Sequence, residues 1–330
     1  MQITFLLGNG FDVNLGMNTK YPDFYKYYCR ELSSNPLIES FKDDIKGNYS
    51  NWSDFELAFG QYCKNFKSRE EFQIVFDDAS EKLAEYIANE ESQYNFEKDY
   101  KSVLYRDLTY PERVLSRADS EIIDSHKKRW AAYGWGINVI SFNYSESLEK
   151  LLGNSSYVNL PKRNNGNSVA LKTIRHIHGY TNKDMVLGVN DSSQITNDIL
   201  SSDAEVLEAF VKSECNKIQK HLIDQDCKEL INKSNLICLF GLSLGDTDKI
   251  WWEFIGERLK SNECRLIIFS KGDEIKPIHN WKKGSMERKI KQYFLSKTNL
   301  TTEEVEEVES RIYVGYNTGI FNIKLEKKII

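Results

Sequence analysis

The stretch FLLGNGFDVNLGM, residues 5–17, decides the fold. An apolar run over residues 3–7 leads into a glycine-rich turn, and a helical pattern follows. In this context Gly8 allows a tight turn, and Gly10 lets a phosphate approach the backbone at the start of a helix. The next glycine, Gly16, comes later than the third glycine of the usual dinucleotide fingerprint. The glycines therefore either hold a nucleotide phosphate or only turn the chain.

Three further apolar runs resemble the first, at residues 137–142, 236–242 and 266–269. Runs without polar alternation suit parallel strands that are covered on both faces. Long segments with helical spacing lie between them. The pattern predicts a Rossmann-like α/β fold, with a parallel sheet flanked by helices.

More than a hundred residues separate the first apolar run from the second, and most of them have a helical pattern. A crossover between parallel strands needs only about a dozen residues. We therefore expect a helical insertion at residues 21–130, placed where it can cover a site at the carboxyl ends of the strands. Residues 1–20 and 131–330 then form the α/β domain, and residues 311–325 alternate like a hairpin or a pair of edge strands.

Composition narrows the class of protein. The 330 residues are 40% hydrophobic and carry a net charge of −5, so no overall field draws the chain onto nucleic acid. The start has no signal-peptide pattern, and no apolar run is long enough for a membrane helix, so we expect a cytoplasmic protein without membrane contact. The six cysteines form no C-x-x-C pair, so neither a zinc module nor another metal site is expected.

Two polar motifs follow the next predicted strands. In VISFNYSESLEKLLG, residues 139–153, Asn143 has an amide that can hold sugar hydroxyls, although it can also cap a helix beginning at Ser145. In TIRHIHGY, residues 173–180, His178 is a candidate general base. His176 is expected to be structural.

Two more segments carry candidate site residues. In LICLFGLSLGDTDKIWWEFI, residues 236–255, Asp248 can accept a ribose hydroxyl or cap a helix. The same segment satisfies G-x-S-x-G around Ser243, but no other element of a serine hydrolase is recognisable. In NWSDFELAFG, residues 51–60, Asp54 and Glu56 are either an acid pair or, as the pattern favours, part of a capping box from Ser53 to Glu56.

Taken together, these motifs resemble those of the sirtuins. Three glycines match the sirtuin loop in spacing, Asn143 matches the asparagine at the nicotinamide ribose, and His178-Gly179 matches the His-Gly of the general base. Two positions depart from the pattern: Asp12 stands where sirtuins have a serine, and Ser145 where they have an aspartate. The four-cysteine zinc module of sirtuins is missing, which speaks against protein deacylation.

The segments LLGNGFD, YPDF, WSDFE, SFNYS, HIHG and FGLSLGDTDK together resemble the AbiH family of bacterial phage abortive-infection proteins, considered distant relatives of sirtuin-like NAD enzymes. The resemblance implies cleavage of NAD to nicotinamide and ADP-ribose. In this reaction His178 activates water, Asn143 fixes the ribose and Glu56 faces the site. The residues that it assigns to cofactor binding are Gly8, Asn9, Gly10, Asp12, Gly16, Ser141, Gly241, Ser243 and Asp248.

Two other functions stay open. The protein can be a binding module that senses a nucleotide without turnover, or a metal-dependent nuclease that uses Asp12, Asp54, Glu56 and Asp246 around Mg²⁺. In each case we expect a phage-derived trigger or a host partner, and a homo-oligomer.

Overall fold

The computed structural model describes residues 1–155, 157–279 and 281–328. Its main feature is a seven-stranded sheet in the order β4-β5-β3-β1-β6-β7-β8, parallel throughout except for the antiparallel pair β4 and β5. The strands are β1 (Gln2–Leu7), β3 (Trp135–Ser141), β4 (Val158–Leu160), β5 (Val169–His176), β6 (Leu236–Phe240), β7 (Arg265–Ser270) and β8 (Ile312–Tyr316). The predicted α/β fold with a mostly parallel sheet flanked by helices is confirmed at this level.

The four apolar runs form β1, β3, β6 and β7, because each is buried on both faces of the sheet. The prediction for residues 311–325 is wrong in part. β8 is an edge strand, but it pairs in parallel with β7 rather than in a hairpin. The chain after β8 packs on the sheet instead, where the ring of Phe321 contacts Phe11 and Phe240. Further on, β9 (Glu326–Lys327) pairs with β2 (Tyr94–Asn95).

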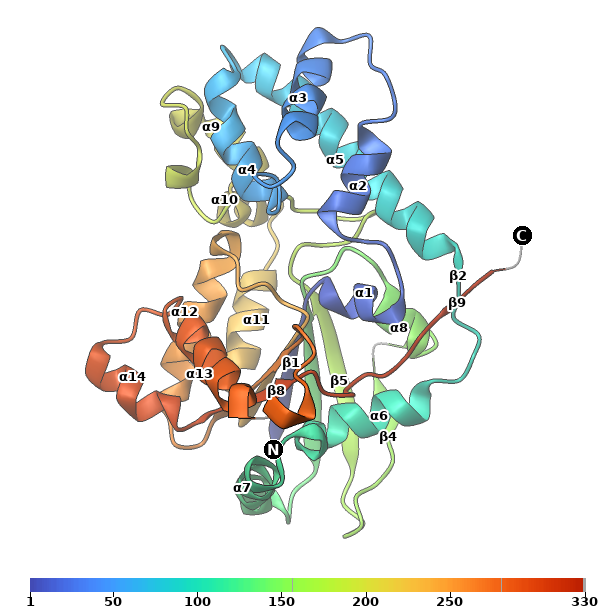
Figure 1. Ribbon diagram of the computed structural model, residues 1–330, viewed down its shortest axis with the longest axis vertical. Helices are drawn as coiled ribbons and strands as arrows, with labels where there is room; N and C mark the ends of the chain where they lie inside the picture. The colour runs from blue at the N-terminus through green and yellow to red at the C-terminus, as the bar shows by residue number, and fades with distance from the viewer. Residues whose placement is uncertain (156, 280, 329–330) are drawn as a thin grey trace.

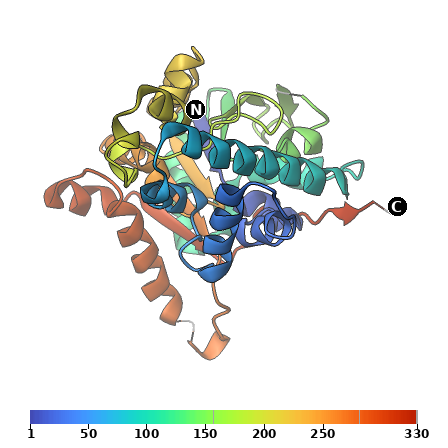
Figure 2. The same ribbon diagram turned by 90° about the horizontal axis from the view of Figure 1, so that it is seen from above.

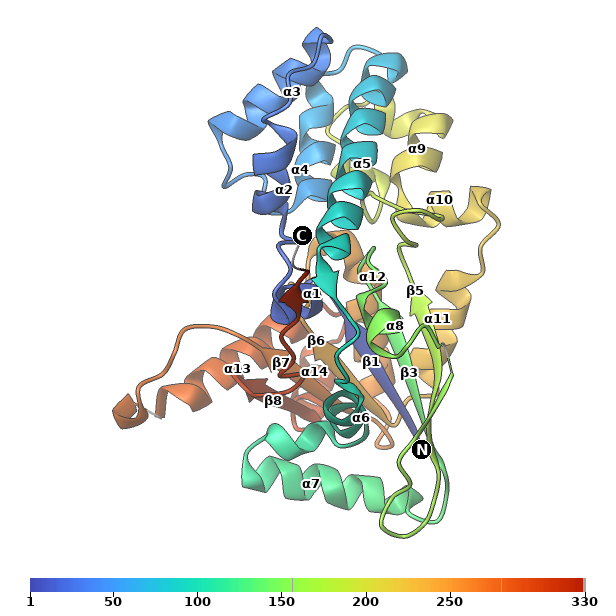
Figure 3. The ribbon, with the colours of Figure 1, turned by 90° about the vertical axis from the view of Figure 1, so that its right-hand side faces the viewer.

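A helical layer lies above the carboxyl ends of the strands, at the top of Figure 1 and Figure 3. Figure 2, seen from above, shows this layer over the sheet. Aromatic side chains form its core, including Trp52, Phe59 and Phe210. The layer consists of α2 (Tyr21–Tyr28), α3 (Pro36–Gly47), α4 (Phe55–Tyr62), α5 (Arg69–Ser92), α9 (Ala204–Phe210) and α10 (Lys212–Ile218).

The remaining α-helices cover the two faces of the sheet. One face packs against α1 (Gly10–Leu15), α6 (Lys101–Thr109), α7 (Arg117–Lys127) and α8 (Ser147–Leu151). The other packs against α11 (Ile223–Asn232), α12 (Lys249–Leu259), α13 (Trp281–Leu295) and α14 (Thr302–Glu309). Short 3₁₀ turns are η1 (Cys63–Asn65), η2 (Pro111–Val114), η3 (Lys128–Trp130), η4 (Ser192–Gln194), η5 (Leu200–Ser202), η6 (Asp246–Asp248) and η7 (Pro277–His279).

The helical layer is therefore built from two separate parts of the chain. Residues 21–92 supply most of it, and residues 204–218 return to it after β5. Within the segment 21–130, the helices α6 and α7 bury Leu104, Leu108 and Ile123 against the sheet rather than in the layer. Among the described residues, no helix combines the length and apolar character needed to cross a membrane.

Candidate functional site

The glycine turn after β1 packs directly on the loop after β6. The amide of Gly8 donates to the carbonyl oxygen of Phe240 at 2.9 Å, and that of Gly10 donates to Gly241 at 2.8 Å. A Cβ on Gly10 would lie only 2.4 Å from Cα of Gly241, whose own φ is +70°. These glycines thus let two strand ends touch, which gives them a packing role. Contact with a phosphate stays a prediction for them.

Two other predicted cofactor residues shape the same loop. Gly16 ends α1 in the left-handed conformation, with φ at +106°. Asn9 donates from Nδ2 to the carbonyl oxygen of Thr19 at 2.8 Å and accepts from the Thr19 hydroxyl. Asn9 therefore holds the loop that leads into the helical layer.

Asp12 is buried beneath this turn and accepts from two hydroxyls, Ser145 Oγ at 2.6 Å and Ser147 Oγ at 2.5 Å. Burial raises the pKa of Asp12 to about 6, although the two hydroxyls act in the opposite direction. Asp12 and Ser145 are the two positions that depart from the sirtuin pattern, and they contact each other. The departures therefore form one hydrogen bond between α1 and the chain after β3.

Asn143 is not a helix cap, because α8 begins at Ser147 and Asn143 lies four residues before it. The backbone N–H of Asn143 donates to Oγ of Ser141 at 3.2 Å, and its backbone carbonyl oxygen lies 2.8 Å from Nδ1 of His176. The other ring nitrogen of His176 is 2.8 Å from Oε1 of Glu149, so His176 is fully engaged within the fold. By contrast, the side-chain Oδ1 of Asn143 is buried and has no hydrogen-bond partner among the described residues.

His178 lies beyond the end of β5 and is 5% exposed. β5 ends at His176, so the alternation of side chains between the two faces of the strand does not continue to His178. His176 faces the carboxylate of Glu149 and His178 faces that of Asp248, so among the described residues the two histidines do not form a metal-binding pair. Nε2 of His178 is 3.1 Å from Oδ1 of Asp248, and the rings of Phe142 and Tyr144 pack nearby. Among the described residues, neither ring nitrogen makes a well-aligned hydrogen bond.

Lys212, the first residue of α10, connects the pair of His178 and Asp248 to the helical layer. Its Nζ is 2.8 Å from Oδ1 of Asp248 and 3.1 Å from Oε2 of Glu56, and it donates to the carbonyl oxygen of Thr247. The sequence analysis missed Lys212. The signal that it offered was a single lysine directly after the apolar pair at positions 210 and 211.

The charges of this cluster depend on one another. For Asp248, burial favours the neutral form, but Lys212 and His178 outweigh it and hold its pKa below the ordinary value. For Glu56, burial outweighs the attraction of Lys212 and leaves the pKa raised. Burial also opposes the charge of Lys212, but the two carboxylates raise its pKa above the ordinary value. The ion pair between Asp248 and Lys212 is therefore stable at neutral pH.

Glu56 reaches the cluster because a neighbour caps its helix. The carboxylate of Asp54 accepts from the amide of Leu57 at 3.1 Å at the start of α4, so the predicted capping box of Ser53 and Glu56 is wrong. Glu56 instead turns inward, where Oε1 accepts from the amide of Gly188 at 3.3 Å. The hydroxyl of Tyr144 donates to the same Oε1 at 3.5 Å.

In the loop after β6, some side chains lie at the surface and one, that of Asp248, belongs to the cluster. Ser243 is exposed, and no described histidine hydrogen-bonds its hydroxyl. Asp246 pairs with Lys297 at 2.7 Å, away from the other acids. Asp248 makes no capping bond to α12, so the capping alternative is wrong and its carboxylate serves the cluster. Among the described residues, no group of three or more Asp, Glu, His or Cys is arranged to hold a metal ion.

A cavity of about 40 Å³ borders His178, Lys212 and Asp248. This space suits water molecules and is far smaller than the several hundred Å³ of most ligand pockets. A larger cavity of about 610 Å³ lies at the opposite, amino ends of the strands and contains none of the predicted site residues. We place the candidate site at the smaller cavity, because the buried titratable groups gather there.

The fold and the site define a parallel α/β protein with a buried His-Asp-Lys-Glu cluster between the strand ends and a helical layer. A family profile described as Bacteriophage abortive infection AbiH matches residues 4–270, and the chain belongs to this family. The match runs from β1 through β7 and includes the whole cluster. Membership implies a function in phage abortive infection. A search of curated proteins finds no match.

Proposed function

We propose that this AbiH protein acts in abortive infection by cleaving NAD to nicotinamide and ADP-ribose on a sirtuin-like fold. The observation that carries the proposal is His178, a buried histidine beside Asp248 with no well-aligned hydrogen bond among the described residues. Buried polar groups nearly always have partners, so a group without one is a candidate for contact with a ligand. The unpartnered Oδ1 of Asn143 adds a second such group.

In the proposed reaction, the bond between the ribose C1′ and the nicotinamide nitrogen breaks, and an oxocarbenium-like sugar forms. Water adds to C1′ and gives its proton to His178, so NAD and water yield nicotinamide, ADP-ribose and a proton. Asp248 stabilises the imidazolium, as a carboxylate does beside a catalytic histidine. Asn143 holds a ribose hydroxyl.

The other residues support this chemistry. Lys212 keeps Asp248 ionised, and Glu56 holds Lys212 from the side of the helical layer. The two loops that carry Gly8, Gly10 and Gly241 form the proposed nucleotide-binding edge, together with Asp12 and Ser141. Asn9 and Gly16 shape this edge through their hydrogen bonds within the loop, and their contact with the cofactor stays a prediction.

The small cavity implies that the site must open before NAD can enter. Lys212 belongs to α10 of the helical layer, whereas Asp248 belongs to the loop after β6, so their ion pair ties the layer to the sheet. We propose that a phage-derived trigger or a host partner shifts this layer. Assembly into a homo-oligomer is a second route to the same movement.

A second candidate function is a nucleotide sensor without turnover. The observation that favours it is the closed cluster, in which Oδ1 of Asp248 already faces both Lys212 and His178, and Oε2 of Glu56 faces Lys212. The sensor binds NAD or ADP-ribose in calorimetry and releases no nicotinamide. Turnover by the wild-type protein distinguishes the two candidates.

The test measures nicotinamide release from NAD by the purified protein, with and without lysate from phage-infected cells. His178→Ala is expected to lose release by a factor of about 10²–10⁴. His221→Ala, which changes a more exposed histidine paired with Asp184, is the matched control and keeps the wild-type rate. Equal rates in His178→Ala and the wild type, or no release under either condition, would overturn NAD cleavage.

A further inference from the structure

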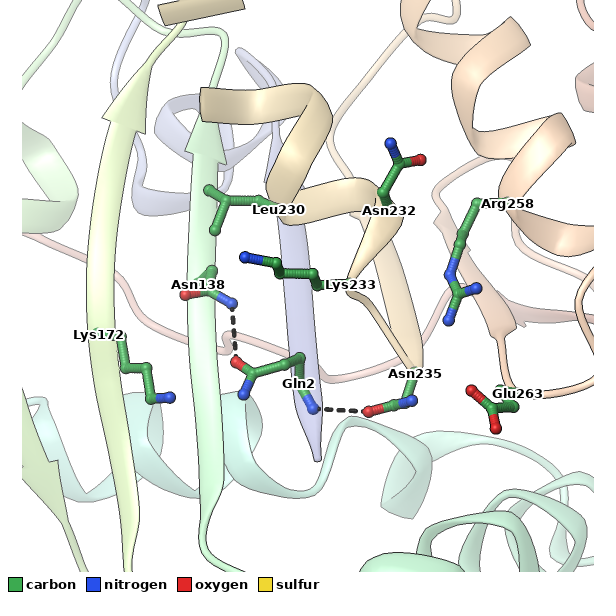
Figure 4. Close-up of a pocket in the computed structure, with 9 residues that line it drawn as sticks. All are labelled: Gln2, Asn138, Lys172, Leu230, Asn232, Lys233, Asn235, Arg258 and Glu263. Atoms are coloured by element: carbon green, nitrogen blue, oxygen red, sulfur yellow. Dashed lines mark hydrogen bonds between the residues drawn. The ribbon is translucent and has the colours of Figure 1, made fainter. Parts of the chain in front are cut away.

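A second cavity, of about 610 Å³, lies at the amino ends of the strands, opposite the candidate site. Figure 4 shows its walls, which come from β1, β3 and β5 on one side and from α11 and α12 on the other. The volume is in the range of sites that take small molecules. None of the described site chemistry at His178 extends to this end of the sheet.

The sheet face beneath this cavity changes character along its length. Central strands of parallel sheets are normally apolar on both faces. On the face that packs against α11 and α12, the carboxyl half follows this rule, but the amino half is polar in two neighbouring strands. The order from amino to carboxyl end is Gln2, Thr4 and Leu6 on β1, and Gly136, Asn138 and Ile140 on β3.

Asn138 is the clearest exception, because its side chain is 4% exposed in a central strand. Its Nδ2 makes one long hydrogen bond, 3.4 Å, to Oε1 of Gln2, and Oδ1 has no donor among the described residues. Figure 4 shows both amides at the floor of the cavity. Because Oδ1 of Asn138 is open to the cavity, a molecule in the cavity can donate a hydrogen bond to it.

Three cations line the same cavity, Lys172 on β5, Lys233 after α11 and Arg258 on α12, and the carboxylate of Glu263 lines it as well. Among the described residues, Lys172 and Arg258 pair with no carboxylate, while Lys233 pairs with Glu229. Gly136 makes room for this arrangement, because a Cβ there would lie 2.6 Å from Cε of Lys172. The cavity thus combines three cations and one carboxylate with two amides that can each donate and accept.

We propose that this cavity binds a small phosphate-bearing molecule. The cations from β5, α11 and α12 bind the phosphate oxygens, which accept several charge-assisted hydrogen bonds at once. The amides of Gln2 and Asn138 bind the polar body of the same molecule, because an amide both donates and accepts. The inference rests on the amino end alone and does not depend on NAD cleavage.

The test is calorimetry on the full chain at constant ionic strength, with inorganic phosphate and AMP as probes. Both are expected to bind, with AMP the tighter because it also reaches the amides. Lys172→Ala changes an exposed side chain and should weaken both probes at least about tenfold. Lys64→Ala, an exposed lysine on η1 in the helical layer, is the matched control and leaves binding unchanged.

A second variant separates the amides from the cations. Asn138→Leu should remove the advantage of AMP over inorganic phosphate and leave phosphate binding intact. The proposal is overturned if neither probe binds the wild type below about 10 mM. It is also overturned if Lys172→Ala binds both as tightly as the wild type does. Because no outcome uses NAD turnover, failure here leaves the proposed function standing.

Discussion

Charged side chains at the two ends of the sheet differ in burial and in pairing. At the carboxyl ends, Glu56, Lys212 and Asp248 are largely buried, and each contacts an opposite charge. At the amino ends, Lys172 and Arg258 border an open cavity and pair with no carboxylate among the described residues. The same parallel strands connect both groups.

This difference separates charges that hold the fold together from charges that are available to a ligand. A buried ion cluster is destabilised when one member is lost, because the remaining charges are left without solvent or partner. An exposed cation is hydrated and can be removed at little cost. Removing a charge should therefore lower the free energy of unfolding much more at the carboxyl ends of the strands than at the amino ends.

Lys212→Met should lower the free energy of unfolding by about 3–5 kcal/mol, because it leaves Glu56 and Asp248 as buried carboxylates without their cation. Urea denaturation at neutral pH measures the loss. The double variant with Glu56→Gln should recover part of it, since one of the two uncompensated carboxylates is then neutral. A loss below about 1 kcal/mol would show that the cluster does not hold the layer to the sheet.

Gly241→Ala should cost about 2–4 kcal/mol, because its φ is +70° and a Cβ would lie 2.7 Å from Cα of Gly10. Gly136→Ala is the matched change at the amino end. There the close atoms are the far ends of the Gln2 and Lys172 side chains, which can move, so we expect a loss below about 1 kcal/mol. Thermal and urea unfolding of both variants check the contrast, which equal losses would contradict.

Asp12 should make stability depend on pH in the direction set by its raised pKa. Between its ordinary value of 3.8 and about 6, the folded state holds a proton that the unfolded state releases. Wild-type stability therefore falls as pH rises through this window and stays at the lower level above it. Relative to Asp12→Asn, the wild type should lose about 2 kcal/mol between about pH 4 and about pH 7.

The measurement is the free energy of unfolding of both proteins across that range. It compares two buried carboxyls at the same end of the sheet: Asp12 accepts hydrogen bonds from two hydroxyls, whereas Asp248 forms an ion pair with a lysine. A constant difference between the two proteins would show that the carboxyl of Asp12 keeps its ordinary pKa.

Lys172→Met should change the free energy of unfolding by less than about 0.5 kcal/mol, because the side chain is exposed and makes no ion pair among the described residues. Urea denaturation beside Lys212→Met gives the direct comparison of the two ends. A loss as large as that of Lys212→Met would mean that the amino-end cations stabilise the fold.

Much of the fold was predictable because its signals are local. Apolar runs mark buried parallel strands, whereas the packing of the glycine turn after β1 against Gly241 was not predicted. The capping of α4 was predicted at the wrong residue, since Ser53, Asp54 and Glu56 compete for the same helix start and only geometry selects Asp54. The hairpin after β8 failed because alternation alone cannot say whether apolar residues pair or pack.

The candidate site was predictable only in part. The motifs placed Glu56, His178 and Asp248 on a common list, and the structure joins Glu56 to Asp248 through Lys212 and places His178 beside Asp248. Lys212 itself carries no motif, and it lies 156 residues from Glu56 in the chain. In the sequence, Asp12 and Ser145 are two separate departures from the sirtuin pattern. The structure shows that they are related, because the hydroxyl of Ser145 donates to the carboxylate of Asp12.

The mostly parallel sheet could be predicted from the sequence because burial on both faces leaves apolar runs, and AbiH membership could be predicted because the motifs and their order resemble that family. Only the tertiary structure decided which charges meet. It buried Lys212 between two carboxylates and left Lys172 facing an open cavity, although both are single lysines in the sequence. The physical reason is that burial and pairing, which set the state and the energy of a charge, depend on residues distant in the chain.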